Sequence, residues 1–284
     1  MDGRQNPTFS IEFFPPRTEA GGPRLDEVHA ELAALHPDFF SVTYGAGGST
    51  KDGTSALVLR YRALGSEVAP HLSFGGTSEE EVRQLLATYD AAGVSRIVAL
   101  RGDIPRESGS QQYRYASELV RFIREETGDR FHIEVACYPE CHPESPDFAS
   151  DVRFFKEKVD AGANSAITQY FFNIDAYFHF LDYCEKAGIN IPIVAGIMPI
   201  YNYANLTRFS EKCGAEIPRW LDKRLQEFQD DPESLKSFGI DVVSELCDKL
   251  LANGVPGLHF YSLNLSRAIV DIWHNLALSD RRPG

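Results

Sequence analysis

Short apolar segments alternate with longer amphipathic segments along the whole chain. The apolar segments are rich in β-branched and aromatic residues and are bounded by Gly or Pro, which predicts β-strands. Runs such as RIVAL and IPIVAGI are apolar almost throughout, which is typical of parallel strands covered on both faces. The predicted strands are Ser10–Phe14, Phe39–Tyr44, Val68–Phe74, Arg96–Leu100, His132–Cys137, Ser165–Phe171, Ile193–Ile197 and Leu258–Ser262.

The segments between these strands repeat apolar residues at helical spacing. Leu25, Val28 and Leu32, for example, share one face of a helix. The predicted helices are Arg24–Leu35, Ser78–Ala92, Tyr115–Thr127, Phe148–Ala161, Ala176–Ala187 and Ser266–Leu276. The connection between the seventh and eighth strands is longer, and it predicts two or three further helices within Asn202–Cys213, Pro218–Gln229 and Pro232–Ala252.

A regular strand–helix alternation of this kind predicts an α/β fold. Eight βα units in 284 residues match a (β/α)₈ TIM barrel with extra helices between strands 7 and 8. A doubly wound open sheet is the alternative, but no G-x-G-x-x-G follows the first strand. No linker divides the chain, so we expect one catalytic domain over residues 1–284.

Polar or glycine-containing tips follow the predicted strands. In a βα-barrel the carboxyl ends of all strands surround one opening, so such tips favour an active site over a structural scaffold. The tips include Glu12 within the first strand, Thr43-Tyr44-Gly45, His71, Arg101-Gly102-Asp103, Tyr138-Pro139-Glu140, Thr168-Gln169, Gly196 to Pro199, and Ser262-Leu263-Asn264.

Charge and cysteine usage exclude several classes of protein. A formal net charge of −13 argues against a nucleic-acid-binding protein, although a few Arg or Lys residues can still form a local anion site. The five cysteines are scattered and odd in number, which is typical of reduced thiols in a cytoplasmic protein. Cys137, Cys141 and His142 could form a partial metal site, but their spacing is not that of a zinc knuckle, and we expect no metal. No apolar run is long enough for a membrane span.

Four tips carry candidate chemistry, each with a structural alternative. Glu12, between apolar neighbours and on the face of Ser10, is either a proton-transfer group or a buried Glu paired with a cation. The loop from Thr43 to Thr50 lets backbone N–H groups approach a ligand, or is merely flexible; it lacks the ending of a P-loop. Arg101-Gly102-Asp103 could hold a phosphate or form a local ion pair. Gln169 among aromatic residues suits a planar heterocycle, or is a satisfied Gln in a buried strand.

Several motifs together resemble one family, from about residue 8 to residue 276. The chain is similar to bacterial methylenetetrahydrofolate reductases and to their catalytic barrel only. Any single motif is weak, but the ordered set is highly specific. The motifs are FSIEFFPPR, SVTYGAGGST, APHLSF, IVALRGD, YPECHP, KVDAGANSAITQYFF, AGIMPI and LHFYSLN.

The resemblance implies a flavoprotein of one-carbon metabolism. It implies non-covalently bound FAD and a ping-pong reduction of 5,10-methylenetetrahydrofolate by NADH or NADPH, with NADH favoured, that supplies methyl groups for methionine biosynthesis. Glu12 matches the general acid, and Asp103 matches the carboxylate near the flavin pyrimidine edge. Gln169 and Phe209 match substrate-binding residues. The positions matched to FAD contacts are Thr43, His71, Arg101, Gly102, Asp103, Tyr115, Ala116, Tyr138, His142, Asp151 and Lys158. From sequence alone, a solvated helical face is the default interpretation of Asp151 and Lys158.

The resemblance also has departures and open points. The family often has an Arg that helps to bind folate where this chain has Leu265, and Arg267 follows two residues later. The matched motifs include no regulatory domain, so we expect no inhibition by S-adenosylmethionine. We expect a cytoplasmic homo-oligomer, a dimer or a tetramer, because both are common in the family. The alternatives are a protein electron donor in place of NAD(P)H, a metal-dependent barrel hydrolase, and a non-catalytic folate- or flavin-binding protein.

Overall fold

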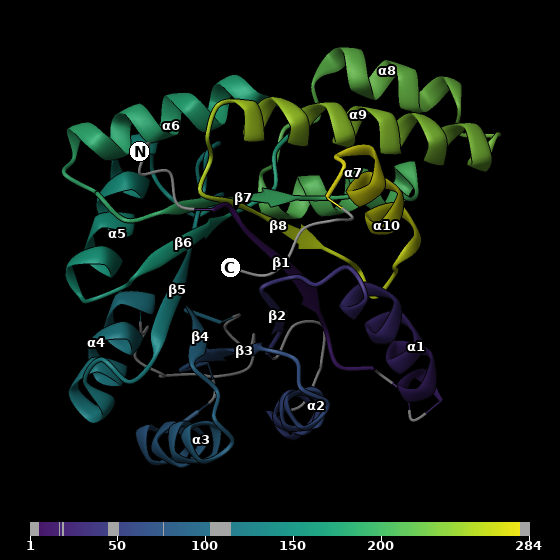
Figure 1. Cartoon of the computed structure of the whole chain (residues 1–284). Coiled ribbons are helices and arrows are strands. Elements are labelled where there is room, and N and C mark those ends of the chain that lie inside the picture. Colours follow the sequence, from purple (N-terminus) through teal and green to yellow (C-terminus); the bar gives the residue numbers. More distant parts are fainter. Residues whose placement is uncertain are drawn as a thin grey trace.

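The computed structural model describes residues 6–16, 18, 20–44, 51–75, 77–102 and 115–278. In this part of the chain, parallel strands close into a barrel in the order β1-β2-β3-β4-β5-β6-β7-β8, and helices surround them (Figure 1). The predicted TIM barrel is therefore confirmed. The strands are β1 (Thr8–Phe13), β2 (Phe39–Val42), β3 (Val68–Ser73), β4 (Arg96–Leu100), β5 (His132–Cys137), β6 (Ser165–Thr168), β7 (Ile193–Ile197) and β8 (Gly257–Tyr261).

The helices follow the predicted order with one addition. They are α1 (Gly21–Ala33), α2 (Lys51–Ala63), α3 (Glu79–Ala91), α4 (Ala116–Thr127), α5 (Phe148–Asp160), α6 (Ile174–Lys186), α7 (Tyr203–Cys213), α8 (Arg219–Glu227), α9 (Pro232–Ala252) and α10 (Arg267–Asn275). The sequence analysis missed α2, which contains Gly53 and follows a glycine-rich stretch, so its local propensity is poor. Its buried Leu57, Val58 and Tyr61 do have helical spacing, and they pack into the core.

Side chains alternate between two environments along each strand. Ile11 and Phe13 of β1 are fully buried in the core between the barrel and its helices. A separate small cluster of Phe39, Ala69 and Val98 fills the barrel interior, with Leu100 packed against it. Because β-strand side chains alternate between faces, Ser10 and Glu12 point into the barrel on the opposite face from Ile11 and Phe13.

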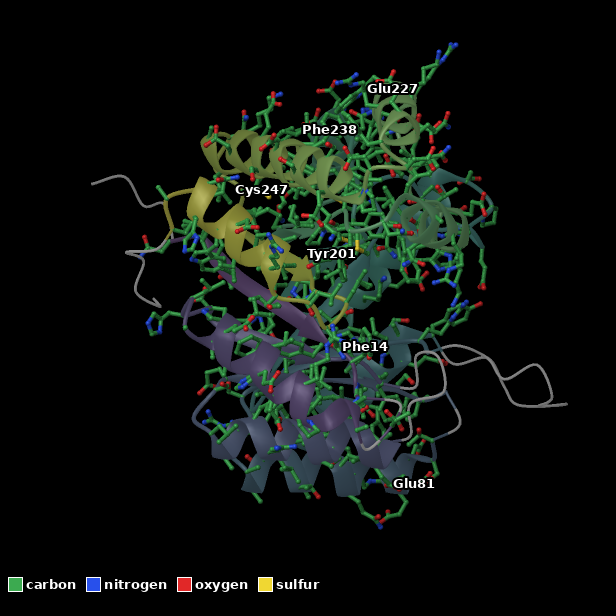
Figure 2. The ribbon with its side chains drawn as sticks, turned by 90° about the vertical axis from the view of Figure 1, so that its right-hand side faces the viewer. Phe14, Glu81, Tyr201, Glu227, Phe238 and Cys247 are labelled. Carbon is green, nitrogen blue, oxygen red and sulfur yellow. The ribbon has the colours of Figure 1, made fainter. Side chains whose placement is uncertain are left out.

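The connection between β7 and β8 forms the predicted elaboration, α7 to α9. Helix α9 packs against β7 and α10, and α8 lies outside α9 (Figure 1). Figure 2 shows Tyr201 near the middle of the molecule, with Phe238 of α9 and Glu227 of α8 farther out on one side. A Cβ atom on Gly239 would lie 2.8 Å from Cβ of Ile200, so this glycine allows α9 to approach the end of β7.

Glu140 joins the loop after β5 to the segment between α7 and α8. Its Oε2 accepts a hydrogen bond from the Glu216 backbone N–H at 2.8 Å. Its Oε1 is buried with no hydrogen-bond partner among the described residues. Burial raises the pKa of Glu140 to about 7, and the nearby negative charge of Glu216 acts in the same direction, whereas the backbone hydrogen bond opposes the rise.

This raised pKa predicts that stability depends on pH. Ionisation of Glu140 is less favourable in the folded protein than in the unfolded chain. The free energy of unfolding therefore keeps the full stabilising contribution of the protonated group below pH 4.5, its usual pKa, and loses that contribution as the pH rises through about 7. Glu140→Gln keeps an acceptor for the Glu216 N–H but cannot ionise. We expect the variant to be more stable than wild type at pH 8 by about 2 kcal/mol and to lose this advantage near pH 5. Urea unfolding at both pH values measures the difference.

Glu185→Gln, an exposed residue of α6, is the control and should leave the pH dependence of wild type unchanged. Identical pH profiles for Glu140→Gln and wild type would contradict the assignment.

Candidate functional site

The carboxyl ends of the strands bring most of the predicted polar tips to one opening. Thr43 follows β2, Arg101 and Gly102 follow β4, Tyr138 follows β5 and Gln169 follows β6. All strands of the barrel are parallel, so these residues surround the same end. Asp103 and the glycine loop from Gly45 to Thr50 lie outside the described residues.

Glu12 lies inside this opening between two histidines. Its Oε2 is 3.6 Å from Nε2 of His71 on β3 and 3.9 Å from Nε2 of His259 on β8. The other ring nitrogen of His259, Nδ1, is 2.7 Å from Oγ of Ser10, so the imidazole is held by β1. The Glu12 side chain keeps 19% of its surface exposed, which leaves the carboxylate accessible to a ligand.

His259 is a site residue that the sequence analysis did not single out. Its only sequence signal is alternation within LHFYSLN, which places His259 and Tyr261 on the same face of β8. Strand pairing then matches Ser10 with His259 and Glu12 with Tyr261. Closure of the barrel between β1 and β8 therefore brings His259 and Tyr261 next to Glu12.

His71 is electrically neutral at neutral pH. Burial lowers its pKa to about 4 against the opposing effect of the Glu12 carboxylate, and His259 makes a smaller contribution in the same direction as burial. Among the described residues, His71 Nε2 and Thr43 Oγ1 are buried without a hydrogen-bond partner. Buried polar atoms are normally paired, so these two atoms have unused hydrogen-bonding capacity at the opening.

Polar side chains also gather where β5 meets α5. Asp151 is buried, and its carboxylate accepts hydrogen bonds from the His142 backbone N–H at 3.1 Å and the Ser145 hydroxyl at 2.9 Å. Lys158 donates from Nζ to the Ala136 carbonyl at 2.5 Å. The default interpretation of Asp151 and Lys158 as a solvated helical face is therefore wrong: Lys158 turns toward β5, and Asp151 turns toward the loop after β5.

Arg101, Tyr138 and the start of α4 border this cluster. The Tyr138 and His142 rings meet edge to face with centroids 4.6 Å apart. Arg101 pairs with Glu144 at 2.7 Å. Tyr115, just before Ala116 at the start of α4, is 51% exposed and stacks on Phe154 of α5.

Gly102 is needed for close packing at the end of β4. It has a left-handed φ of +82°, and a Cβ atom there would lie 2.5 Å from Ser73 Oγ at the end of β3. The absence of a side chain at Gly102 therefore lets the end of β4 approach the neighbouring strand closely.

Gln169 and Phe209 lie on two elements that contact each other. Gln169 donates its backbone N–H to the Cys137 carbonyl at 2.8 Å, and its Oε1 accepts from the Tyr170 backbone N–H at 3.0 Å. The Tyr170 hydroxyl is 3.0 Å from Oγ of Ser210, the residue after the half-buried Phe209. Helix α7 is therefore attached next to the end of β6.

The segment after β8 is held by hydrogen bonds between side chains and the backbone. Asn264 has a left-handed φ of 57°, and its side-chain amide pairs with both the N–H and the carbonyl of Phe14. The Leu265 carbonyl accepts from the Tyr201 hydroxyl at 3.2 Å. Arg267 is exposed as the first residue of α10, whereas Leu265 is half-buried.

Within the described ranges, no group of three or more His, Cys, Asp or Glu side chains is arranged to hold a metal ion. None of the helices in those ranges has the length and apolar character needed to cross a bilayer.

Comparison with known proteins identifies the family. The chain matches the family model for methylenetetrahydrofolate reductase over residues 1–277. It is 41% identical over 270 residues to the 5,10-methylenetetrahydrofolate reductase of Buchnera aphidicola subsp. Schizaphis graminum, covering 95% of this chain and 91% of that protein. It is 39% identical over 290 residues to methylenetetrahydrofolate reductase (NADH) 1 of Arabidopsis thaliana, covering 96% of this chain and 48% of the plant protein.

A solved structure shares the fold at lower identity. An uncharacterized protein from Clostridium thermocellum, which binds two copies of 5-methyl-5,6,7,8-tetrahydrofolic acid, matches with a TM-score of 0.66 and 20% identity, covering 97% of this chain and 94% of that one. At this identity the likeness concerns the fold alone. The family match and the bacterial relative decide the identity: the chain belongs to the methylenetetrahydrofolate reductase family, whose members reduce 5,10-methylenetetrahydrofolate to 5-methyltetrahydrofolate.

Proposed function

We propose that this reductase uses non-covalently bound FAD, takes hydride from NADH in preference to NADPH, and protonates its folate substrate from Glu12. The observation that carries the proposal is Glu12 in the barrel opening, half-buried between His71 and His259. The name of the plant relative, which specifies NADH, supports the choice of donor.

The described residues suit a flavin dinucleotide. His71 Nε2 and Thr43 Oγ1 are buried polar atoms with no partner among the described residues, as expected of groups that would contact the isoalloxazine or ribityl part. Arg101, His142 and Lys158 lie by the end of β5 and would hold the diphosphate or adenosine. Tyr115 and Ala116, which the resemblance also matches to FAD contacts, would assist from the start of α4. When bound, FAD supplies a two-electron carrier that accepts hydride from the nicotinamide and donates it to the folate methylene group.

Glu12 supplies the proton that the folate reaction needs. Protonation of N10 opens the five-membered ring of 5,10-methylenetetrahydrofolate and leaves an electrophilic iminium at N5. His259, oriented by Ser10, lies next to the carboxylate and would support the transfer. Gln169 would hydrogen-bond the pterin, and Phe209 on α7 would contact both substrates in turn. Asp103, by the resemblance, would favour a positively charged iminium.

The role of Glu12 predicts a separation of the two half-reactions. In Glu12→Gln the amide cannot donate the required proton, so we expect NADH to reduce the enzyme-bound flavin while reoxidation by methylenetetrahydrofolate slows about 10²-fold or more. Anaerobic stopped-flow absorbance measures both steps. Glu227→Gln on α8 (Figure 2), far out on the elaboration, is the control and should behave as wild type. Folate reduction at the wild-type rate in Glu12→Gln would eliminate Glu12 as the acid.

The identity of the donor predicts a second result. Anaerobic mixing of wild-type holoenzyme with each nicotinamide should give flavin reduction at least about tenfold more efficiently with NADH than with NADPH, a ratio equivalent to about 1.4 kcal/mol. Reduction by NADPH alone would reverse the assignment. Reduction by neither, with intact reoxidation by folate after chemical reduction, would instead favour a protein electron donor.

A further inference from the structure

The hydrogen-bond ladder between β6 and β7 stops at Ile167, two residues before Gln169. The pairing of these strands consists of Ala166 with Ile193 and Ile167 with Val194. Beyond that point, the Gly196 backbone N–H donates to the side chain of Thr168, to Oγ1 at 2.8 Å. A side-chain oxygen therefore replaces the backbone acceptor that a continued ladder would use.

Tyr261 uses the carbonyl that this change leaves available. Its hydroxyl donates to the Thr168 carbonyl oxygen at 2.7 Å, so a residue of β8 reaches β6 across β7. The chain lacks a side chain where Tyr261 crosses: a Cβ atom on Gly196 would lie 2.9 Å from Cε2 of Tyr261 and 2.1 Å from the Thr168 oxygen. The Tyr261 hydroxyl can therefore reach the Thr168 carbonyl only because residue 196 is a glycine.

The Tyr261 ring is also fixed on its other sides. It meets the His259 ring edge to face with centroids 5.2 Å apart, and the Tyr170 ring at 6.3 Å. Burial raises the pKa of Tyr261 well above its usual value, and the Glu12 carboxylate adds to the rise, so the hydroxyl stays protonated as a donor. Tyr261 is therefore a rigid neutral group beside Glu12.

The anchored carbonyl belongs to the peptide bond that leads into Gln169. The Gln169 backbone N–H is the other end of that peptide unit, and it donates to the Cys137 carbonyl at 2.8 Å. With both ends of a planar peptide held, the position of the Gln169 Cα atom is set. The hydrogen bond from the Tyr170 backbone N–H to Gln169 Oε1 at 3.0 Å then restrains the side chain itself.

We propose that Tyr261 is a positioning residue for the folate and nicotinamide sites, which acts by holding the Thr168 carbonyl and thereby directing Gln169 into the barrel opening. This inference rests on the proposed role of Gln169 in binding the pterin. In this role Tyr261 takes part in neither proton transfer nor hydride transfer. A change at Tyr261 should therefore alter the affinity for the folate more than the rate of the chemical step.

A double-mutant cycle with Gln169 tests the proposal. Tyr261→Phe in the holoenzyme should weaken binding of 5-methyltetrahydrofolate, measured as a Kd by titration of the flavin absorbance, about five- to tenfold. Gln169→Ala should also weaken it. In the Gln169→Ala background, Tyr261→Phe should add less than about twofold, because its effect passes through the side chain already removed.

Tyr177→Phe is a matched control. The Tyr177 hydroxyl also donates to a strand carbonyl, that of Ile193, at 2.7 Å, but it lies at the start of β7, away from the opening. It should lower Tm about as much as Tyr261→Phe while leaving the Kd at the wild-type value. Gly196→Ala, whose Cβ atom would clash with both the Thr168 carbonyl and the Tyr261 ring, should also break their hydrogen bond and weaken binding like Tyr261→Phe.

The outcomes separate this inference from the proposed function. The positioning role is overturned if Tyr261→Phe raises the Kd by the same factor with and without Gln169→Ala, or if Tyr261→Phe alone keeps the wild-type Kd. In either case, flavin reduction and folate turnover by the wild-type enzyme still support the proposed function. A wild-type Kd for Gln169→Ala overturns the assignment of Gln169, and the inference with it.

Discussion

Closure of the barrel between β1 and β8 is the constraint on which the site depends. This seam pairs Ser10 with His259 and Glu12 with Tyr261, residues that are almost the whole chain apart. Side chains reinforce it: Ser262 donates to the Glu12 carbonyl, and the Asn264 amide binds the backbone of Phe14. The carboxylate therefore sits on a backbone fixed from both sides, and the histidine beside it arrives from the other end of the sequence.

The two ends of the barrel handle buried polar groups differently. At the amino-terminal end, the Glu134 carboxylate contacts His132, pairs with Arg96 and accepts a hydrogen bond from the Ser165 hydroxyl at 2.5 Å. Burial raises the pKa of Glu134, but these partners, His132 foremost, bring it below its usual value. A buried charge with satisfied partners serves stability. At the carboxyl-terminal end, His71 and Thr43 keep polar atoms without partners among the described residues. Unused hydrogen-bonding capacity is costly in a folded protein, and at this opening a ligand could take it up.

Much of the fold could be predicted from the sequence because apolar periodicity and glycine boundaries are local signals. All the strands and the elaboration after β7 were found in this way, whereas α2 was missed because its helical spacing follows a glycine-rich stretch. Of the site, Glu12 was recognised from a carboxylate between apolar neighbours. Asp151 and Lys158 matched family positions, yet their contacts with β5 and the loop after it depend on how α5 packs, which no local pattern reveals.

The sequence by itself determined the class of fold, the end of the barrel that carries polar groups, and the family. It could do so because strand alternation, helical spacing and ordered motifs are properties of neighbouring residues. Only the tertiary structure decided which groups meet: His259 with Ser10 and Glu12, and Tyr261 with the carbonyl before Gln169. Those contacts follow from the register of a closed barrel, in which a shift by one residue would turn every side chain of a strand to its opposite face.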